Sequence, residues 1–136
     1  MIVAIDFGIT NTDVALSNKS QYKFFSIPSK NANESFIDEI ISLIDIDITE
    51  ISQIVVTGGK SNELNESYKG VNLTKISETD AIGYGTKEIY KIENEPFITL
   101  SCGTGTACIH HQDGQFSYSG GIAVGGGTIS GLSKAI

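Results

Sequence analysis

The stretch DFGITNTDVALS follows a short apolar run at the start of the chain and concentrates side chains that could do chemistry. A turn between two strands can aim several N–H groups at one point, and glycine lets a ligand approach the backbone closely. Phosphate is the natural ligand of such a turn. We expect the amides and hydroxyls of Gly8, Thr10, Asn11 and Thr12 to bind it. Asp6 would hold Mg²⁺ directly or through water. The alternative is a plain hairpin turn.

A second turn of similar composition, CGTGT, lies far along the chain. Its candidate phosphate ligands are Gly103, Thr104, Gly105 and Thr106. Taken alone it is ambiguous, since it lacks the lysine and the spacing of a Walker A loop. Residues 97–119 repeat the order of residues 2–27, namely strand, turn, strand, turn and strand. Two such turns at equivalent places favour a pair of phosphate-binding turns.

Two further features are candidates for the same chemistry. The run Gly125, Gly126 and Gly127 precedes an expected helix, whose N-terminal dipole favours anions; a flexible hinge is the alternative. Glu78 lies where an expected strand meets an expected helix, so its carboxylate could take a proton from a hydroxyl. The alternative for Glu78 is that it and Asp80 complement the helix dipole in a capping-box sequence.

Hydrophobic periodicity supplies the elements that would position these residues. Alternating β-type residues predict strands, and apolar residues three and four apart predict helices that pack on a sheet. The expected strands are 1–5, 13–17, 22–27, 54–57, 71–76, 97–101, 107–111 and 115–119. The expected helices are 33–44, 77–91 and one from near Thr128, with a short helix between the fourth and fifth strands.

Composition restricts the partners. The chain has 136 residues, 40% of them hydrophobic, and a net charge of −7, with nine basic residues that are all lysines. We therefore expect neither nucleic acid nor an anionic membrane as a partner. The two cysteines are too few for a disulfide framework, and no apolar run has the length of a membrane span. These features favour a cytoplasmic protein.

Five motifs, in order and spacing, resemble the N-terminal half of type II pantothenate kinases. They are DFGITNT, VVTGG, SETDAIGYG, LSCGTGT and GGIAVGGGTISGL. These kinases belong to the superfamily of actin, sugar kinases and heat-shock-chaperone ATPases. The resemblance spans essentially the whole chain and implies an α/β fold of the actin-like, ribonuclease H-like ATPase class. It further implies a complete first domain over residues 1–95 and the truncated start of a second over residues 96–136.

The same resemblance implies a function. Asp6–Thr12 and Ser101–Thr106 would be the first and second phosphate motifs, and Gly125–Gly127 would line the nucleotide cleft. Glu78 would be the catalytic base for transfer of the γ-phosphate of Mg-ATP to the hydroxyl of pantothenate, in coenzyme A biosynthesis. The cofactors implied are ATP and Mg²⁺, and the partner is a small-molecule substrate.

Some positions depart from the family pattern. Ile9 and Asp13 stand where these kinases usually have a glycine and a lysine, and FSYSGG lacks an arginine that helps to bind pantothenate. GITNTD by itself is similar to the opening of ATP-dependent hydantoinases, which remains an alternative, as does a non-catalytic nucleotide-binding or partner-binding half-domain. Because such kinases continue beyond the glycine run, we expect the chain alone to be inactive and to form a homodimer or require a C-terminal half.

Overall fold

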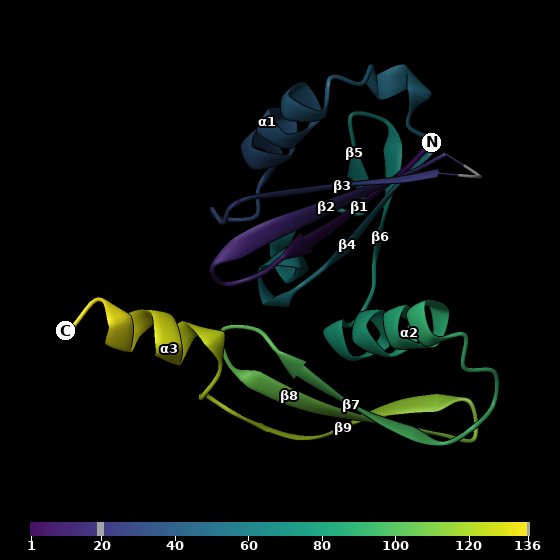
Figure 1. Cartoon of the computed structure of the whole chain (residues 1–136). Coiled ribbons are helices and arrows are strands. Elements are labelled where there is room, and N and C mark those ends of the chain that lie inside the picture. Colours follow the sequence, from purple (N-terminus) through teal and green to yellow (C-terminus); the bar gives the residue numbers. More distant parts are fainter. Residues whose placement is uncertain (19–20, 136) are drawn as a thin grey trace. The chain divides into compact units, whose positions relative to one another are not determined.

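The structure, a computed structural model, describes residues 1–18 and 21–135, which form two compact units, Met1–Ile76 and Ser77–Ile136. The first unit is a six-stranded mixed sheet in the order β3-β2-β1-β4-β6-β5 (Figure 1). β1 runs parallel to β4, and β4 runs parallel to β6, while the other neighbours are antiparallel. Its elements are β1 (Ile2–Phe7), β2 (Asn11–Asn18), β3 (Gln21–Pro28), α1 (Glu34–Ile44), η1 (Ile48–Glu50), β4 (Gln53–Thr57), η2 (Gly59–Glu63), β5 (Ser67–Tyr68) and β6 (Val71–Lys75).

The core of the first unit lies between α1 and one face of the sheet. Every second residue of β1 is buried, and α1 buries the face that its apolar period predicts. The main contributors are Val3, Ile5, Phe7, Ile54, Val56, Phe36, Ile37 and Ile40. Each such side chain contributes about 1.5–3 kcal/mol when it leaves water. α1 begins where the Asn33 carboxamide accepts the Phe36 N–H at 2.9 Å, and it ends at Asp45, whose φ of 53° is left-handed.

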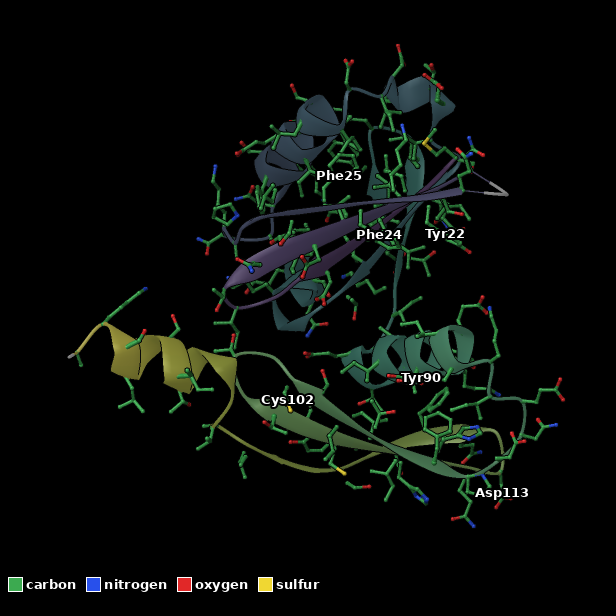
Figure 2. The ribbon with its side chains drawn as sticks, viewed as in Figure 1. Tyr22, Phe24, Phe25, Tyr90, Cys102 and Asp113 are labelled. Carbon is green, nitrogen blue, oxygen red and sulfur yellow. The ribbon has the colours of Figure 1, made fainter. Side chains whose placement is uncertain are left out.

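The edge strand β3 places its aromatic side chains on both faces of the sheet. Phe25 pairs with the buried Val14 and lies on the α1 side, whereas Phe24 pairs with Ala15 on the opposite side. Tyr22 and Phe24 stack on each other, and both are largely exposed (Figure 2). The face opposite α1 therefore presents apolar surface at this edge.

The second unit is a three-stranded antiparallel meander that α2 covers on one face. Its elements are α2 (Glu78–Tyr90), β7 (Phe97–Cys102), β8 (Thr106–Gln112), β9 (Gln115–Ile122) and α3 (Gly126–Ser133). Between α2 and the sheet, the ring of Phe116 lies against Gly83 and meets Tyr84 edge-on, with ring centroids 4.8 Å apart. His111 is buried between Phe97 and Phe116, and its Nδ1 lies 3.1 Å from the Glu95 carbonyl oxygen. Its neighbour His110 is on the other face of the sheet, because successive side chains of a strand alternate.

The elements agree well with those expected from periodicity. Each expected strand and helix is present, including the short helix η2, and the α/β class is confirmed. η1 and β5 were not predicted, and α3 begins at Gly126 rather than near Thr128. The units divide after Ile76 because α2 contacts β7, β8 and β9, while the expected domain boundary near residue 95 stays a prediction. Among the described residues, the helices are all too short or too polar to cross a bilayer.

The contact between Gly83 and Phe116 predicts opposite effects for two glycines of the same helix. A Cβ on Gly83 would lie 2.3 Å from the Phe116 ring, whereas a Cβ on Gly85 would meet nothing within 4 Å. Gly83→Ala should therefore destabilise the second unit by about 1–3 kcal/mol through overpacking. Gly85→Ala should stabilise it by about 0.5–1 kcal/mol, because alanine is the better helix former. Urea unfolding of both variants measures the difference, and equal effects would contradict the packing described here.

Candidate functional site

The first glycine turn joins β1 to β2 at the edge of the sheet where the parallel strands β1 and β4 both end. In register, Asp6 pairs with Thr57, the last residue of β4. Gly58 follows with a left-handed φ of 88°, and a Cβ there would lie 2.5 Å from the Phe7 carbonyl oxygen and 2.9 Å from Asp6 Oδ1. Only glycine fits this position without strain. The VVTGG motif thus brings the segment that follows β4 and leads into η2 against Asp6.

Asp6 and Asp13 lie opposite each other in the β1–β2 ladder. Their side chains are on the sheet face away from α1, since Phe7 and Thr12, which follow and precede them, are buried on the α1 face. No group of three or more His, Cys, Asp or Glu within residues 1–18 and 21–135 could hold a metal ion. A single carboxylate nevertheless fits Mg²⁺, which usually keeps several waters and takes its other ligands from substrate phosphates. One carboxylate such as Asp6 is thus compatible with Mg²⁺, and the role of Asp6 as its ligand stays a prediction.

Ser29 braces the first turn from the α1 side. Its hydroxyl donates to the Gly8 carbonyl oxygen at 2.6 Å, and its N–H donates to the Thr10 carbonyl oxygen at 3.0 Å. Thr12 Oγ1 lies 3.2 Å from Ser29 Oγ, and Thr12 is completely buried. Because the Ser29 proton is used on Gly8, Thr12 must be the donor in that bond. In this structure the Thr12 hydroxyl thus fixes the shape of the turn, while Gly8, Thr10 and Asn11 form its outer part.

The second turn and the glycine run lie together in the second unit. Gly126 and Gly127 donate their N–H groups to the carbonyl oxygens of Gly103 and Thr104, at 2.8 and 3.2 Å. Thr106 Oγ1 donates to the Val124 carbonyl oxygen at 2.8 Å. A Cβ on Gly125 would lie 2.6 Å from the Gly105 carbonyl oxygen. The structure therefore brings two separately predicted motifs together, and the approach at Gly125 is too close for a side chain.

The N-terminus of α3 uses its amides within the protein. Besides the two bonds to the second turn, the N–H groups of Thr128 and Ile129 both point to the Gly125 carbonyl oxygen, at 3.1 and 3.4 Å. Thr128 Oγ1 also accepts the Gly125 N–H at 3.2 Å. The glycine run therefore holds the second turn in place through the N–H groups of Gly126 and Gly127.

Glu78 is the first residue of α2 and is exposed to solvent. Ser77 caps the helix, since its hydroxyl oxygen accepts the Asp80 N–H at 3.0 Å, and the hydroxyl donates to the Asp80 carboxylate at 2.7 Å. Asp80 therefore occupies the third helical position, as the capping-box form predicts. Because Ser77 supplies the N-cap of α2, the Glu78 carboxylate is not needed as the cap. Its role as a catalytic base stays a prediction.

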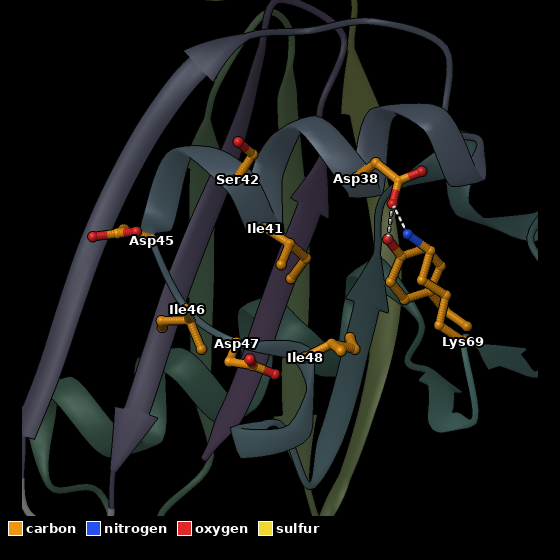
Figure 3. Close-up of a pocket in the computed structure, with 9 residues that line it drawn as sticks. Asp38, Ile41, Ser42, Asp45, Ile46, Asp47, Ile48 and Lys69 are labelled. Carbon is orange, nitrogen blue, oxygen red and sulfur yellow. Dashed lines mark hydrogen bonds and ion pairs between the residues drawn. The ribbon is translucent and has the colours of Figure 1, made fainter.

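A separate groove of about 560 Å³ lies between α1, η1 and β5 (Figure 3). Its lining consists of Asp38, Ile41, Ser42, Asp45, Ile46, Asp47, Ile48, Tyr68 and Lys69. Hydrogen bonds from the Lys69 ammonium and the Tyr68 hydroxyl lower the pKa of the Asp38 carboxyl. None of the residues predicted from sequence lines this groove. The two glycine turns, one in each unit, rather than the groove, remain the candidate phosphate sites.

Sequence comparison finds relatives along nearly the whole chain. The chain is 36% identical to a type II pantothenate kinase of Bacillus anthracis and 35% identical to one of Bacillus cereus strain AH820. Each alignment covers 98% of this chain and 48% of the relative, so the chain spans about half the length of the curated relatives it matches. No protein-family model matches the chain. The resemblance inferred from the five motifs is confirmed.

Structural comparison identifies the fold. The activator of 2-hydroxyisocaproyl-CoA dehydratase from Clostridium difficile matches 98% of the chain and 51% of its own, with a TM-score of 0.68 at 18% identity. A ROK family glucokinase from Streptomyces griseus matches 88% of this chain and 47% of its own, with a TM-score of 0.60 at 10% identity. The chain has the predicted fold of the actin-like ATPase and sugar-kinase class.

The close contact of Gly125 with the second turn predicts that a side chain at this position would lower the stability of the second unit. Gly125→Ala should push the turn away from α3 and destabilise the second unit by about 1–3 kcal/mol. Gly131→Ala, later in the same helix, should be neutral or stabilising, because a Cβ there meets nothing within 4 Å. Urea unfolding, together with amide exchange at Gly126 and Gly127, tests both. Slow exchange at these amides in the Gly125 variant would show that the turn is not held in this way.

Proposed function

We propose that this chain is the nucleotide-binding part of an ATP-dependent kinase that phosphorylates the hydroxyl of pantothenate or a similar small metabolite. The observation that carries the proposal is the identity of 33–36% to type II pantothenate kinases over 98% of the chain, a span that includes both glycine turns. The folding of those turns supports it, because each one is fixed by contacts from outside the turn. A turn that is held rigid before the ligand arrives loses little entropy on binding.

The first turn would bind phosphate through Gly8, Thr10 and Asn11, and the second through Gly103, Thr104 and Gly105. Thr12 and Thr106 would support these turns, since their hydroxyls bond within the protein. The role of Gly125, Gly126 and Gly127 would be to hold the second turn in position by backbone contacts. Such transfer depends mainly on positioning and on neutralising charge, which rigid amide-lined turns supply.

Asp6 would hold Mg²⁺, which would neutralise charge on the phosphates while the γ-phosphoryl group is transferred. Glu78 would accept the proton of the acceptor hydroxyl while that oxygen bonds to the γ-phosphorus and ADP leaves. An exposed carboxylate at the first position of a helix, with the cap already supplied by Ser77, is free to do so.

The outer face of the β7–β9 sheet supports a further proposal, that copies of this chain associate. Ile98, Leu100 and Ile122 are 66%, 65% and 63% exposed on the face that α2 does not cover. Neighbouring exposed apolar side chains of this kind mark interaction surfaces.

The Glu78 assignment is tested in a chimera that joins this chain to the half of the Bacillus anthracis kinase that the alignment leaves uncovered. Glu78→Gln should lower the rate of phosphoryl transfer from Mg-ATP to pantothenate by about 10²-fold or more, as losses of a general base do. The melting temperature should hardly change, because Glu78 is not the cap. Asp80→Asn is the control: it should lower the melting temperature and keep most of the rate. An active but destabilised Gln variant would assign Glu78 to the helix start.

Self-association is tested by sedimentation velocity over a range of protein concentrations. The chain should sediment as a dimer or larger species, and the pair Ile98→Asp and Leu100→Asp should shift it to monomer. The matched pair Tyr22→Asp and Phe24→Asp, on the other unit, should leave the association unchanged. A monomeric wild-type chain at all concentrations, or dissociation by the second pair only, would contradict an interface on the β7–β9 face.

A further inference from the structure

We infer that Lys60 supplies the positive charge for an anion bound at the first glycine turn, and that Ser29 is the residue that positions it. The inference rests on the proposed function only in naming the anion as the phosphate chain of a nucleotide. Lys60 follows Gly58 and Gly59 at the beginning of η2. Its ammonium donates to Ser29 Oγ at 3.3 Å. Nothing in the motif pattern of the sequence singles out Ser29.

The first turn needs a cation if it is to hold a phosphate. Asp6 and Asp13 flank the turn and lie opposite each other in register, so their negative charges would repel an incoming anion. The chain has no arginine that could offset this charge. Mg²⁺ at Asp6 would neutralise part of it, but the amides of a turn carry only partial charges. A full positive charge beside the turn would favour phosphate strongly.

Lys60 is the lysine that the fold brings to this turn. Gly58 packs on Phe7 and Asp6, which brings the beginning of η2 against the end of β1. η2 is held in place by Ser61, whose buried hydroxyl donates to the Gly58 carbonyl oxygen at 2.7 Å. Within residues 1–18 and 21–135, the ion pairs of lysines involve Lys30, Lys69 and Lys91, and Lys60 has no carboxylate partner. Its charge is therefore available to a ligand.

Ser29 couples the lysine to the shape of the turn. One oxygen atom donates its proton to the Gly8 carbonyl oxygen and accepts from both Thr12 and Lys60. This arrangement uses all of the hydrogen-bonding capacity of the hydroxyl. The turn and the ammonium are thus held by the same atom. A change in the shape of the turn would therefore shift the position of the Lys60 ammonium. A lysine held in this way also loses less side-chain entropy when the anion binds.

The test uses the 136-residue chain with two probes, Mg-ATP and inorganic tripolyphosphate, and measures affinity by calorimetry and binding site by amide chemical shifts. Lys60→Met should raise the dissociation constant for both probes by roughly 10-fold or more, the usual value of a hydrogen bond to a charged group. Lys23→Met, on the exposed strand β3, is the control for net charge and should change the affinity little. The shifts on binding should include Gly8 and Asn11.

Ser29→Ala tests the positioning role by a double-mutant cycle. If Ser29 holds Lys60, Lys60→Met should cost less in the Ser29→Ala background than in the wild-type chain. Additive effects would assign Ser29 to the stability of the turn alone and overturn its positioning role. Melting temperatures of the four proteins separate a loss of folding from a loss of affinity.

The outcomes separate this inference from the proposed function. ATP binding that is equal in the wild-type and Lys60→Met chains would overturn the role of Lys60 and leave the kinase proposal intact. Binding of tripolyphosphate that depends on Lys60, without binding of Mg-ATP, would support Lys60 and contradict nucleotide binding by this chain. Absence of shifts at the first turn with either probe would overturn both.

Discussion

The parallel pairing of β1 with β4 is the interaction on which the first candidate site depends. Val3 and Ile5 on β1 and Ile54 and Val56 on β4 are all nearly inaccessible to water, so the register between the two strands is set by the core. A slip of one residue would move these side chains to the opposite face. The same register puts Asp6 beside Thr57 and lets Gly58 close on Asp6. The apolar residues thus fix where the polar ones meet, and ligands of parallel sheets commonly bind at this carboxyl-terminal edge.

The two glycine turns reach rigidity by different routes. The first is held by side chains, since the Ser29 hydroxyl donates to the Gly8 carbonyl oxygen from the core side and Thr12 bonds to Ser29. The second is held by the backbone of the glycine run, through the N–H groups of Gly126 and Gly127. A Cβ on Gly125 or Gly127 would lie 2.6 or 2.7 Å from the second turn, so these two positions require glycine, whereas a Cβ on Gly126 would lie 3.2 Å from the Gly103 carbonyl oxygen. The second route also removes α3 amides from the set that could bind an anion, so the turn itself must provide the donors.

Most of the fold could be predicted from periodicity, because the core of the first unit alternates regularly along β1, β2 and β4, and α1 has a clear apolar face. β5 was missed because two residues carry no periodic signal. η1 was missed for a similar reason, being a single turn of three residues. The glycine run was recognised, but its contact with the second turn joins residues about twenty positions apart and leaves no local pattern.

The role of Ser29 could not be predicted from the sequence either, because it depends on contacts between residues far apart along the chain. It lies 21 residues from Gly8 and 31 from Lys60 along the chain, in a segment whose composition resembles any strand end. Only the antiparallel pairing of β2 with β3, in which Asn11 opposes Pro28, carries Ser29 to the first turn. From the sequence, Lys60 after TGG could reach a phosphate but is more often a solvated loop lysine. That pairing, together with the contact of Gly58 with β1, places Lys60 at the first turn. A charge placed by two independent strand pairings is better fixed than one on a free loop. For this reason Ser29 and Lys60 favour an anion at the first turn more strongly than do the glycine and threonine residues that first indicated it.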